Sequence, residues 1–527
     1  MTVRVRHKPR HLGTTILDAI NDPALFAPAF KNPESWAAWH VFLSALFGLP
    51  LNDEQRELFR ECTRRDAPNL EGHTEAWLVC GRRGGKSFIM ALTAVYLATF
   101  KDYTQHLSPG ERGTIMLIAQ DRRQARVLVR YIKGLLHSVP MLKALIDSER
   151  TDQIDLCNRV TIEVHTASFR STRGYSIVAA VLDEIAFWPI ENAAEPDTEI
   201  IAALRPGMAS IPGSIMLCAS SPYARKGALW ESYKTHFGKN GDPCLVWQAP
   251  TRTMNPSITQ SVINYEMERD PAKAAAEYGA EFRTDVESFV SLEVIKACIA
   301  QGVFERPHQS RFRYFAFVDP SGGSADSFTL AIAHRDADSL FLDAIREVRP
   351  PFSPESVVIE YAGLMRSYRI TKVTGDRYAG EWPREQFRKY GVRYEVADKS
   401  KSDIYRDMLP LLNSRRCELL DHSKLVSQFV SLERRTARGG RDSIDHPSHS
   451  HDDIANAVAG VLTETATPRR FTIFSAHGAA QLEIHRKLNR GMSNAERNSC
   501  IPGKGLDAEL SLFNAQRGFL PYPVRRQ

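Results

Sequence analysis

Hydrophobic positions along the chain fall into two blocks in which short apolar runs alternate with longer amphipathic segments. The first block opens at Glu75, and its short runs are rich in aliphatic and β-branched residues. These runs, which predict strands, are EAWLVC (75–80), GTIMLIAQ (113–120), RVTIEVHTA (159–167), YSIVAAVLDE (175–184) and SIMLCASS (214–221). Residues 86–100 and 121–136 repeat their apolar positions at a spacing near ~3.6, which predicts helices. Apolar strands that alternate with helices predict a mainly parallel sheet covered on both faces.

The second block begins near residue 306 and has a different order of elements. Consecutive strand-like runs in YFAFVDPSGGSADSFTLAIAH (314–334) and SLFLDAIREVR (339–349) precede strand–helix alternation, which predicts a mixed sheet. Between the two blocks, the stretch NPSITQSVINYEMERDPAKAAAEYGAEF (255–282) is polar, helical in pattern and without strand-like runs. We therefore divide the chain into a helical lead-in (1–50), a first α/β domain (51–250), a helical linker (251–305), a second α/β domain (306–467) and a basic C-terminal tail (468–527).

Composition narrows the class of protein only modestly. The chain has 527 residues, a formal net charge of +6 and eight cysteines. The charge is compatible with nucleic acid binding but does not establish it. The cysteines form no C-x-x-C pair, which argues against a zinc site or a disulfide framework. No apolar run approaches the ~18 residues of a membrane span and no secretory signal is present, so we expect a protein of a reducing cytoplasm.

The stretch LVCGRRGGKSF (78–88) carries most of the phosphate-binding pattern G-x-x-x-x-G-K-[ST], with Cys80 in the place of the first glycine. Such a loop wraps backbone N–H groups around the β-phosphate, and its lysine and hydroxyl reach the γ-phosphate and magnesium. A strand precedes the loop and a helix follows it, which is the structural context that the motif needs. The residues predicted to bind nucleotide are Gly81, Gly84, Gly85, Lys86 and Ser87.

The run IVAAVLDE (177–184) ends a buried strand on two acids, Asp183 and Glu184. Downstream of a phosphate-binding loop, we expect Asp183 to hold magnesium and Glu184 to polarise the attacking water. Ser220 and Ser221 end another strand and are candidates to sense the γ-phosphate, although a plain turn is an equal alternative. Arg82 or Arg83 is a candidate to stabilise the transferring phosphoryl group, within the loop or from a neighbouring subunit, and a solvated loop charge is the alternative.

Acidic residues recur at the ends of predicted elements in the second block. Asp319 and Asp376 each end a strand-like run, and Asp452 and Asp453 begin a helix. Acids placed in this way are typical of a ribonuclease-H-like sheet, which holds two divalent ions ~3.5–4 Å apart for phosphodiester hydrolysis. His449 and His451 are weaker candidates for metal or phosphate ligands, since surface histidines in a polar loop are the favoured alternative. Asp326 could approach a metal or only cap a turn. Lys399 and Lys401 are equally compatible with DNA phosphate contact and with a solvated helix start.

Together the two blocks resemble the large terminase subunit of tailed bacteriophages, a motor that packages viral DNA. The resemblance covers roughly residues 36–462 and rests on motifs that occur in the family's order. These motifs are CGRRGGKS, STRGYSIVAAVLDE, CASSPYARKGALWE, NPSI…EYGAEF, VDPSGG, TGDRYAG and HDDIANAV.

The resemblance implies roles for individual residues. Glu184 would be the catalytic base, Asp183 a magnesium ligand, and Ser220–Ser221 the segment that couples hydrolysis to movement. Gln55 in LNDEQRELF matches the glutamine that reads adenine in the family. The nuclease acids would be Asp319, Asp376 and the Asp452–Asp453 pair, with the leading member of that pair left open.

The resemblance also implies the cofactors and partners. ATP and Mg²⁺ would serve the motor, and Mg²⁺ or Mn²⁺ the nuclease. Double-stranded DNA, the capsid portal and a small terminase subunit would be the partners of a homo-oligomeric ring in the host cytoplasm, with no membrane. Two other interpretations are a helicase–nuclease of DNA repair, which would need a second motor-like lobe, and a non-catalytic DNA-binding assembly factor, which would leave both sets of acids idle.

Overall fold

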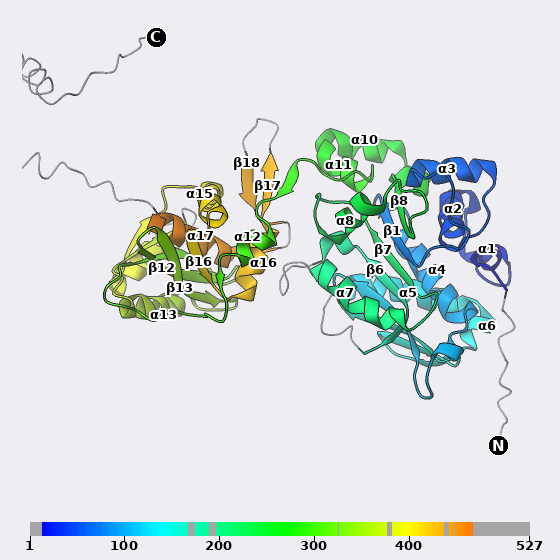
Figure 1. The fold of residues 1–527 in the computed structure, drawn as a ribbon, viewed down its shortest axis with the longest axis horizontal. Helices are drawn as coiled ribbons and strands as arrows, with labels where there is room; N and C mark the ends of the chain where they lie inside the picture. Colours follow the sequence, from blue (N-terminus) through cyan, green and yellow to red (C-terminus); the bar gives the residue numbers. More distant parts are fainter. Residues whose placement is uncertain are drawn as a thin grey trace, which may run out of the picture. The chain divides into compact units, whose positions relative to one another are not determined.

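The computed structural model describes residues 13–166, 174–188, 196–324, 326–376, 382–436, 442–447 and 450–466, apart from the side chain of Arg122 (Figure 1). Within these ranges the chain forms two large β-sheets, each with helices on both faces. The first sheet is built from residues 75–249 and the second from residues 299–420.

The first sheet has eight strands, and six of them run parallel. From edge to edge the order is β3 (Ile146–Glu149), β4 (Gln153–Leu156), β5 (Val160–Thr166), β2 (Gly113–Ala119), β6 (Ser176–Asp183), β7 (Ile215–Ser220), β1 (Glu75–Cys80) and β8 (Cys244–Ala249). The strands from β5 to β8 pair in parallel, whereas β3 and β4 form an antiparallel edge. This arrangement confirms the predicted mainly parallel sheet.

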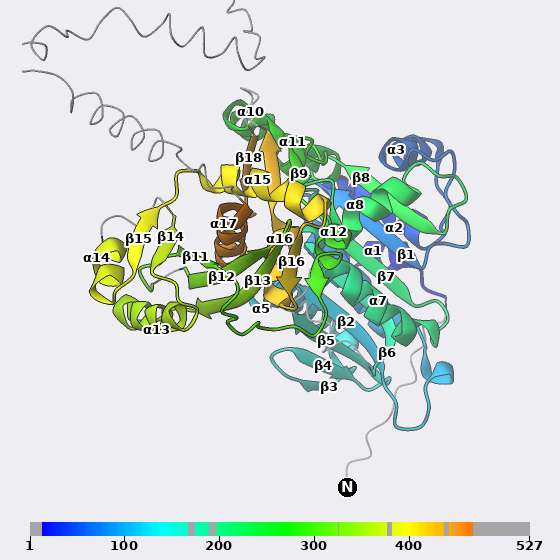
Figure 2. The same ribbon diagram turned by 60° about the vertical axis from the view of Figure 1, so that its left-hand side comes forward.

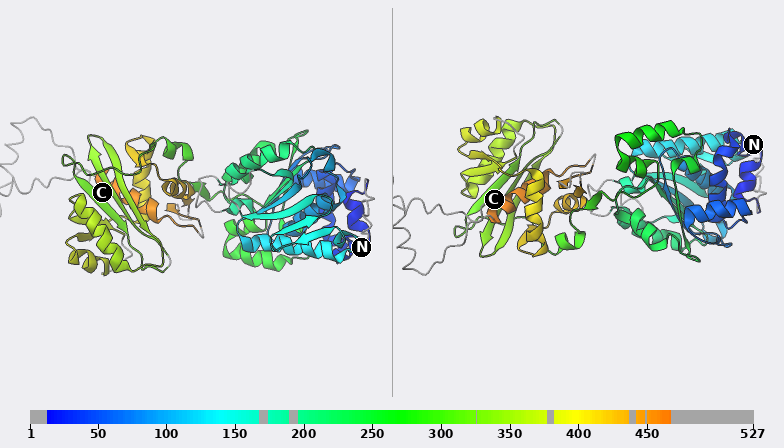
Figure 3. Two further views of the ribbon diagram at one scale, coloured as in Figure 1. Left: turned by 90° about the horizontal axis from the view of Figure 1, so that it is seen from below. Right: turned by 90° about the horizontal axis from the view of Figure 1, so that it is seen from above.

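Each face of the first sheet packs into its own hydrophobic core, because side chains along a strand alternate between faces. Leu78 joins the core that contains α2 (Ala37–Leu46), α4 (Lys86–Phe100) and α5 (Arg122–Ser138). Its neighbour Trp77 joins the core under α7 (Pro196–Ala209) and α8 (Gly227–His236). Figure 3 shows this layered arrangement from two further sides. Burial on both faces explains why the strands are apolar throughout.

The second sheet has seven strands and is mixed, as predicted. The order is β10 (Ile299–Ala300), β16 (Cys417–Leu420), β13 (Ser339–Val348), β12 (Phe328–Asp336), β11 (Tyr314–Asp319), β14 (Lys372–Gly375) and β15 (Arg393–Val396). Strands β11, β12 and β13 pair antiparallel, whereas β14 and β15 continue from β11 in parallel. Three antiparallel strands followed by two parallel ones agree with the expected ribonuclease-H-like sheet (Figure 2).

Helices cover both faces of this sheet as well. One core lies under α13 (Pro354–Ser367) and α14 (Trp382–Lys389), and the other under α15 (Lys401–Asn413), α16 (Ser423–Ser431) and α17 (Asp453–Ala466). Helix α17 approaches β11 closely, since a Cβ on Gly460 would lie 2.5 Å from the Phe317 ring. A glycine is therefore needed at position 460 for α17 to pack this closely against β11.

The remaining elements differ in part from the expected helical linker. The other helices are α1 (Ile16–Asn21), α3 (Asp53–Thr63), α6 (Pro140–Lys143), α9 (Thr251–Met254), α10 (Gln260–Arg269), α11 (Pro271–Glu277) and α12 (Leu292–Lys296). Residues 255–282, expected to be helical and without strands, contain α10 and α11. Beyond them, β9 (Val286–Ser288) pairs with β17 (Glu433–Thr436), which also pairs with β18 (Asp442–Asp445). Strand β10 also joins the second sheet. Both strands are too short to show a period-2 pattern.

No helix in the described ranges is long and apolar enough to cross a membrane. The lead-in before residue 13 and the predicted basic tail lie outside the described residues.

Candidate nucleotide and metal sites

The phosphate-binding loop joins the end of β1 to the start of α4, as the motif predicts. Cys80 is fully buried as the last residue of β1, and burial raises the pKa of its thiol to about 12, so that it packs as a neutral side chain. Gly81 follows Cys80, and its lack of a side chain lets Thr251 approach the loop closely. A Cβ at Gly81 would lie 2.3 Å from the hydroxyl of Thr251. Gly85 has a φ of +97° at the start of α4, a conformation that favours glycine.

Lys86 and Ser87 already converge on the two strand-end acids. The Lys86 ammonium donates to the carbonyl of Cys80 at 3.0 Å and lies 3.7 Å from Glu184 Oε1. The Ser87 hydroxyl donates to Asp183 Oδ2 at 3.1 Å. Since the strands run in parallel, their carboxyl ends share one edge of the sheet, where such folds bind ligands. The loop, its lysine and both acids therefore form one site.

The electrostatics of Asp183 suit a metal ligand. Burial and the neighbouring Glu184 carboxylate raise the pKa of Asp183 to about 6. The Ser87 bond and the Lys86 charge only partly offset this shift. Because the charged form of Asp183 is disfavoured, a bound divalent cation would stabilise it. Carboxylate and hydroxyl oxygens are ligands that suit Mg²⁺.

Glu184 is held in place by the end of β7. Its backbone has a left-handed φ of 49°, and its Oε2 accepts from the Ser220 hydroxyl at 3.1 Å and from the Ser221 backbone N–H at 3.3 Å. The structure thus places the two predicted coupling serines directly against the predicted catalytic base. This contact gives a physical route between that carboxylate and the segment that follows β7.

We expect Ser220→Ala to slow ATP turnover without weakening nucleotide binding. The substitution removes a hydrogen bond to a charged group, which is worth about 1.5–3 kcal/mol, or roughly 10- to 100-fold in rate if the bond orients Glu184 in the transition state. Steady-state hydrolysis and fluorescent-nucleotide binding measure the two effects separately. Unchanged turnover would contradict a role for Ser220 in positioning Glu184.

The two loop arginines differ in their surroundings. Arg82 pairs with Glu277 at 3.2 Å and is also tied through its backbone to the same residue. Arg83 is exposed and has a left-handed φ of 62°. Its carbonyl accepts from Asn255 at 2.8 Å, which fixes the loop while leaving the guanidinium directed outward. The choice between Arg82 and Arg83 as the residue that acts on phosphate remains a prediction.

Gln55 lies at the start of α3, where it has a structural partner. Its side-chain oxygen accepts from the Asn52 backbone N–H at 2.9 Å, and the Asn52 side chain accepts from the Gln55 N–H at 2.8 Å. This reciprocal pair is a capping box. The predicted role of Gln55 in reading adenine has no support from this contact and stays a prediction.

The acids of the second block gather where β11, β14 and α17 meet. Asp319 ends β11, Asp376 follows β14, and Asp453 begins α17. Asn456, one turn into α17, donates to Asp319 Oδ2 at 2.8 Å. The start of α17 is anchored to β12, since the Ser327 N–H donates to Asp453 Oδ2 at 3.2 Å.

Burial and, to a smaller extent, mutual repulsion raise the pKa values of these carboxylates. Burial, together with the charges of Asp453, Asp376 and Asp452, raises the pKa of Asp319 to about 8, although the Asn456 hydrogen bond opposes the shift. Burial and Asp452 likewise raise the pKa of Asp453. Closely spaced carboxylates with unbalanced charge and hard oxygen donors fit Mg²⁺ or Mn²⁺.

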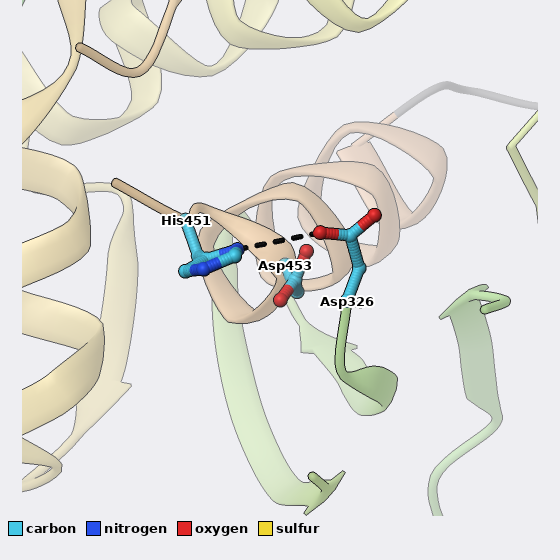
Figure 4. A group of neighbouring side chains, drawn as sticks. All are labelled: Asp326, His451 and Asp453. Carbon is cyan, nitrogen blue, oxygen red and sulfur yellow. Dashed lines mark ion pairs between the residues drawn. The ribbon is translucent and has the colours of Figure 1, made fainter. Parts of the chain in front are cut away.

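Two groups of potential ligand atoms flank this cluster. Asp326, His451 and Asp453 form one group, in which His451 Nδ1 lies 3.4 Å from Asp326 Oδ1 (Figure 4). Asp445, His446 and Asp452 form the other, and in each group the ligand atoms lie within 4.8 Å of one another. The sequence patterns indicated His451 and Asp326 only weakly. They did not point to Asp445 or His446, because neither residue ends an apolar run.

We expect divalent metal binding to the second cluster to release a proton near neutral pH. A raised pKa means that Asp319 holds its proton up to about pH 8, and the metal must displace it. Mn²⁺ affinity should therefore rise by about tenfold per pH unit between pH 6 and 8 and level off above that range. Calorimetry in buffers of different ionisation enthalpy measures the proton released. An affinity that stays flat from pH 6 to 8 would contradict the protonated state of Asp319.

Comparison with known proteins agrees with the geometry of the first site. Residues 78–205 match the family model described as terminase large subunit, T4likevirus-type, N-terminal. This range contains the phosphate-binding loop together with Asp183 and Glu184. A search of curated proteins returned no match.

Several solved structures are similar to the chain at low identity. The large terminase of bacteriophage HK97 is 16% identical, with 79% of this chain and 95% of that chain covered and a TM-score of 0.36. The large terminase of a thermophilic bacteriophage, solved in complex with ADP, is 12% identical, covering 74% and 93%, with a TM-score of 0.32. The large terminase nuclease of the thermophilic phage G20c with bound magnesium is 14% identical, covering 34% and 96%, with a TM-score of 0.30.

The fold and the two sites define an α/β chain with a phosphate-binding loop and strand-end acids on a mainly parallel sheet, and with a cluster of acids on a mixed sheet. Over residues 78–205, the chain is similar to the N-terminal part of the terminase large subunit family.

Proposed function

We propose that this protein is an ATP-driven motor that moves double-stranded viral DNA into a preformed capsid, and a metal-dependent endonuclease that cuts the DNA. The observation that carries the proposal is the presence, in one chain, of two separately assembled sites. Lys86, Ser87, Asp183 and Glu184 converge at the edge of the first sheet, and the acids around Asp319 converge on the second.

In the ATPase site, nucleotide replaces contacts that the protein makes with itself. The Lys86 ammonium, which donates to the Cys80 and Gly81 carbonyls, would turn to the β- and γ-phosphates. Ser87 and Asp183, now bonded to each other, would both bind magnesium. Glu184 then orients the attacking water, and Arg82 or Arg83 stabilises charge on the γ-phosphoryl group.

Loss of the γ-phosphate would reach the rest of the motor through Glu184. The Ser220 hydroxyl and the Ser221 N–H hold that carboxylate, so a shift of Glu184 moves the end of β7. The segment that follows β7 would pass this movement to DNA. This path is the coupling role that we propose for Ser220 and Ser221.

In the nuclease site, Asp319, Asp376 and Asp453 would hold Mg²⁺ or Mn²⁺. A divalent metal, when bound there, lowers the pKa of water and stabilises the departing oxygen of the phosphodiester. Asn456 orients the Asp319 carboxylate through its 2.8 Å hydrogen bond, and Ser327 fixes Asp453. His451 and Asp326 have ligand atoms within 4.8 Å of that of Asp453 and could add to the metal ligands there.

The partners in this proposal are double-stranded DNA, the portal of an empty capsid and a small terminase subunit that selects viral DNA. The active form would be a homo-oligomeric ring at the portal in the host cytoplasm. The family match supports the packaging role in general, and the net charge of +6 is compatible with DNA. The basic tail from residue 468 is a candidate contact for portal or DNA.

The domains in this proposal are an ATPase domain over residues 51–250 and a nuclease domain over residues 306–467. A repair helicase would need a second motor-like lobe. Among the described residues, however, the second sheet carries the acid cluster in place of a phosphate-binding loop. The nuclease interpretation is therefore preferred over that alternative.

Purified protein tests the proposal with two assays. ATP hydrolysis is measured with and without linear double-stranded DNA, and plasmid cleavage with and without Mg²⁺ or Mn²⁺. We expect hydrolysis that DNA stimulates and cleavage that requires metal. Finding neither activity in the presence of metal would favour a non-catalytic assembly factor.

A further inference from the structure

Lys401 turns inward at the start of α15 and lies between two carboxylates. Its ammonium is 2.8 Å from Asp445 Oδ1 and 2.9 Å from the Asp452 carboxylate. The neighbouring Lys399, by contrast, pairs with Asp407 at the surface. Lys401 is therefore placed to act within the protein, and its partners come from β18 and from the start of α17.

Both carboxylate oxygens of Asp452 have hydrogen-bond partners within the protein. Only 3% of the residue is exposed, and its Oδ2 accepts from the buried Tyr405 hydroxyl at 2.7 Å. Lys401 also donates to Asp452, so the carboxylate is paired with one positively charged donor and one neutral donor. Such a carboxylate gains little from a further cation, since burying an ion is favourable only when its charge and hydrogen bonds are balanced.

The surroundings of Lys401 have the composition of a cation site. Ligand atoms of Asp445, His446 and Asp452 lie within 4.8 Å of one another, and His446 Nε2 is 3.9 Å from Asp452 Oδ1. Carboxylate and imidazole donors together suit a transition-metal ion such as Mn²⁺. Although burial opposes its charge, the carboxylates of Asp452 and Asp445 hold the pKa of Lys401 above its usual value, and the ammonium stays charged.

Asp453, the next residue, has a different environment. Its Oδ2 accepts a hydrogen bond from the neutral Ser327 N–H, and its ligand atom lies within 4.8 Å of those of His451 and Asp326. Asp319 likewise accepts from a neutral donor, the Asn456 amide. The two adjacent aspartates thus divide into one that is balanced by lysine and one that is not.

We propose that Lys401 is a positioning residue whose ammonium takes the place of a divalent cation on Asp452, so that metal is held by Asp319, Asp376 and Asp453 instead. The inference rests on the proposed nuclease function. Lys401 ties β18 to the start of α17, and the start of α17 presents Asp453 and Asn456 to Asp319. It therefore decides which of the adjacent aspartates binds metal.

The full-length chain with Mn²⁺ as the probe tests this inference without DNA. Electron paramagnetic resonance counts bound Mn²⁺ for wild type, Lys401→Met, Lys401→Arg and Lys389→Met. Lys389 forms an exposed ion pair with Glu355 on α14 and α13, and serves as the matched control. We expect Lys401→Met to gain one Mn²⁺ site per chain, whereas Lys401→Arg and Lys389→Met keep the wild-type number. Adding Asp445→Asn to Lys401→Met should remove the gained site.

Cleavage kinetics supply a second readout. We expect Lys401→Met to lower kcat for plasmid cleavage by about 10- to 100-fold with little change in KM for DNA. The reason is that Lys401 positions the segment that carries the metal ligands and does not contact DNA in this proposal. Lys401→Arg should restore most of the loss. A rise in KM without a gained Mn²⁺ site would instead make Lys401 a DNA contact and overturn the inference.

Two further variants keep the test decisive if Lys401→Met fails to fold. Asp452→Asn should bind Mn²⁺ within about threefold of wild type, whereas Asp453→Asn should lose at least tenfold in affinity, since only the second acid is a metal ligand in this proposal. Equal losses, or a larger loss for Asp452→Asn, would overturn the inference. If wild type neither binds Mn²⁺ nor cleaves DNA, the proposed nuclease fails. In that case, a Mn²⁺ site gained in Lys401→Met would still show that the ammonium takes the place of a cation on Asp452, and the lack of one would contradict it.

Discussion

Asp319→Asn is expected to reduce metal-dependent DNA cleavage by about 10³-fold or more while ATP hydrolysis persists. Metal activation of water and of the leaving oxygen is worth several kcal/mol, and each 1.36 kcal/mol is about tenfold in rate. Asn456 donates to Asp319 Oδ2, and an asparagine at 319 still offers an oxygen to that donor. The loss should therefore reflect the missing charge rather than a disturbed fold. Plasmid cleavage with Mg²⁺ and ATP turnover are measured on the same preparation.

Asp326→Asn is the matched control for this prediction. Asp326 lies seven residues further along, is exposed, and contacts the site only through the group with His451 and Asp453. We expect a loss of cleavage much smaller than that of Asp319→Asn. Equal losses would place Asp326 among the metal ligands, and a loss confined to Asp326→Asn would show that the strand-end acid was wrongly assigned.

Glu184→Gln should act on the other site. We expect nucleotide binding to be kept and ATP turnover to fall by about 10²–10⁴-fold. The glutamine keeps an oxygen that can accept from Ser220, while Lys86, Ser87 and Asp183 still provide the binding contacts. Turnover falls because the amide cannot polarise the attacking water. Binding is measured with a fluorescent ATP analogue and turnover by phosphate release.

Lys86→Ala separates binding from chemistry in the same site. Without the ammonium, we expect both nucleotide affinity and turnover to fall, and plasmid cleavage to remain. If Glu184→Gln also failed to bind nucleotide, Glu184 would have a structural role. If Lys86→Ala removed cleavage in a folded protein, the two sites would not be independent.

Local patterns in the sequence predicted the elements that hold the two sites. The phosphate-binding loop lies between a strand and a helix within eleven residues, and the strand ends at Asp183 and Asp319 are set by continuous apolar runs. Parallel pairing then brings strand ends to one edge of a sheet without further information. The mainly parallel sheet, the mixed sheet and the converging acids could therefore be predicted.

Contacts between distant residues could not be predicted in this way. Lys401 meets Asp445 and Asp452 across 44 and 51 residues, and only the packing of α15 against α17 and β18 brings them together. The short strands β9 and β10 were missed for a related reason. A strand of two or three residues shows no periodicity, and it forms because the partner strand is already in place.

Two roles can be assigned to the Gln55 side chain, namely adenine recognition from the family resemblance and helix capping from the local sequence. Asn52 and Gln55 are three residues apart at a helix start, which is the spacing of a capping box, and the structure shows both of its hydrogen bonds. That signal was present in the sequence. It favours helix stabilisation as the role of this side chain.

The most direct test of the two proposed sites is one crystal structure of the protein with Mn²⁺, ADP and a metal fluoride that mimics the transferring phosphoryl group. Anomalous scattering from manganese should appear in two places. One lies beside Ser87 and Asp183, with Arg82 or Arg83 on the fluoride, and the other is bounded by Asp319, Asp376 and Asp453. Lys401 should remain on Asp452. Manganese bound between Asp445 and His446 with the lysine displaced, or the lack of manganese at either acid cluster, would contradict the proposed pair of sites.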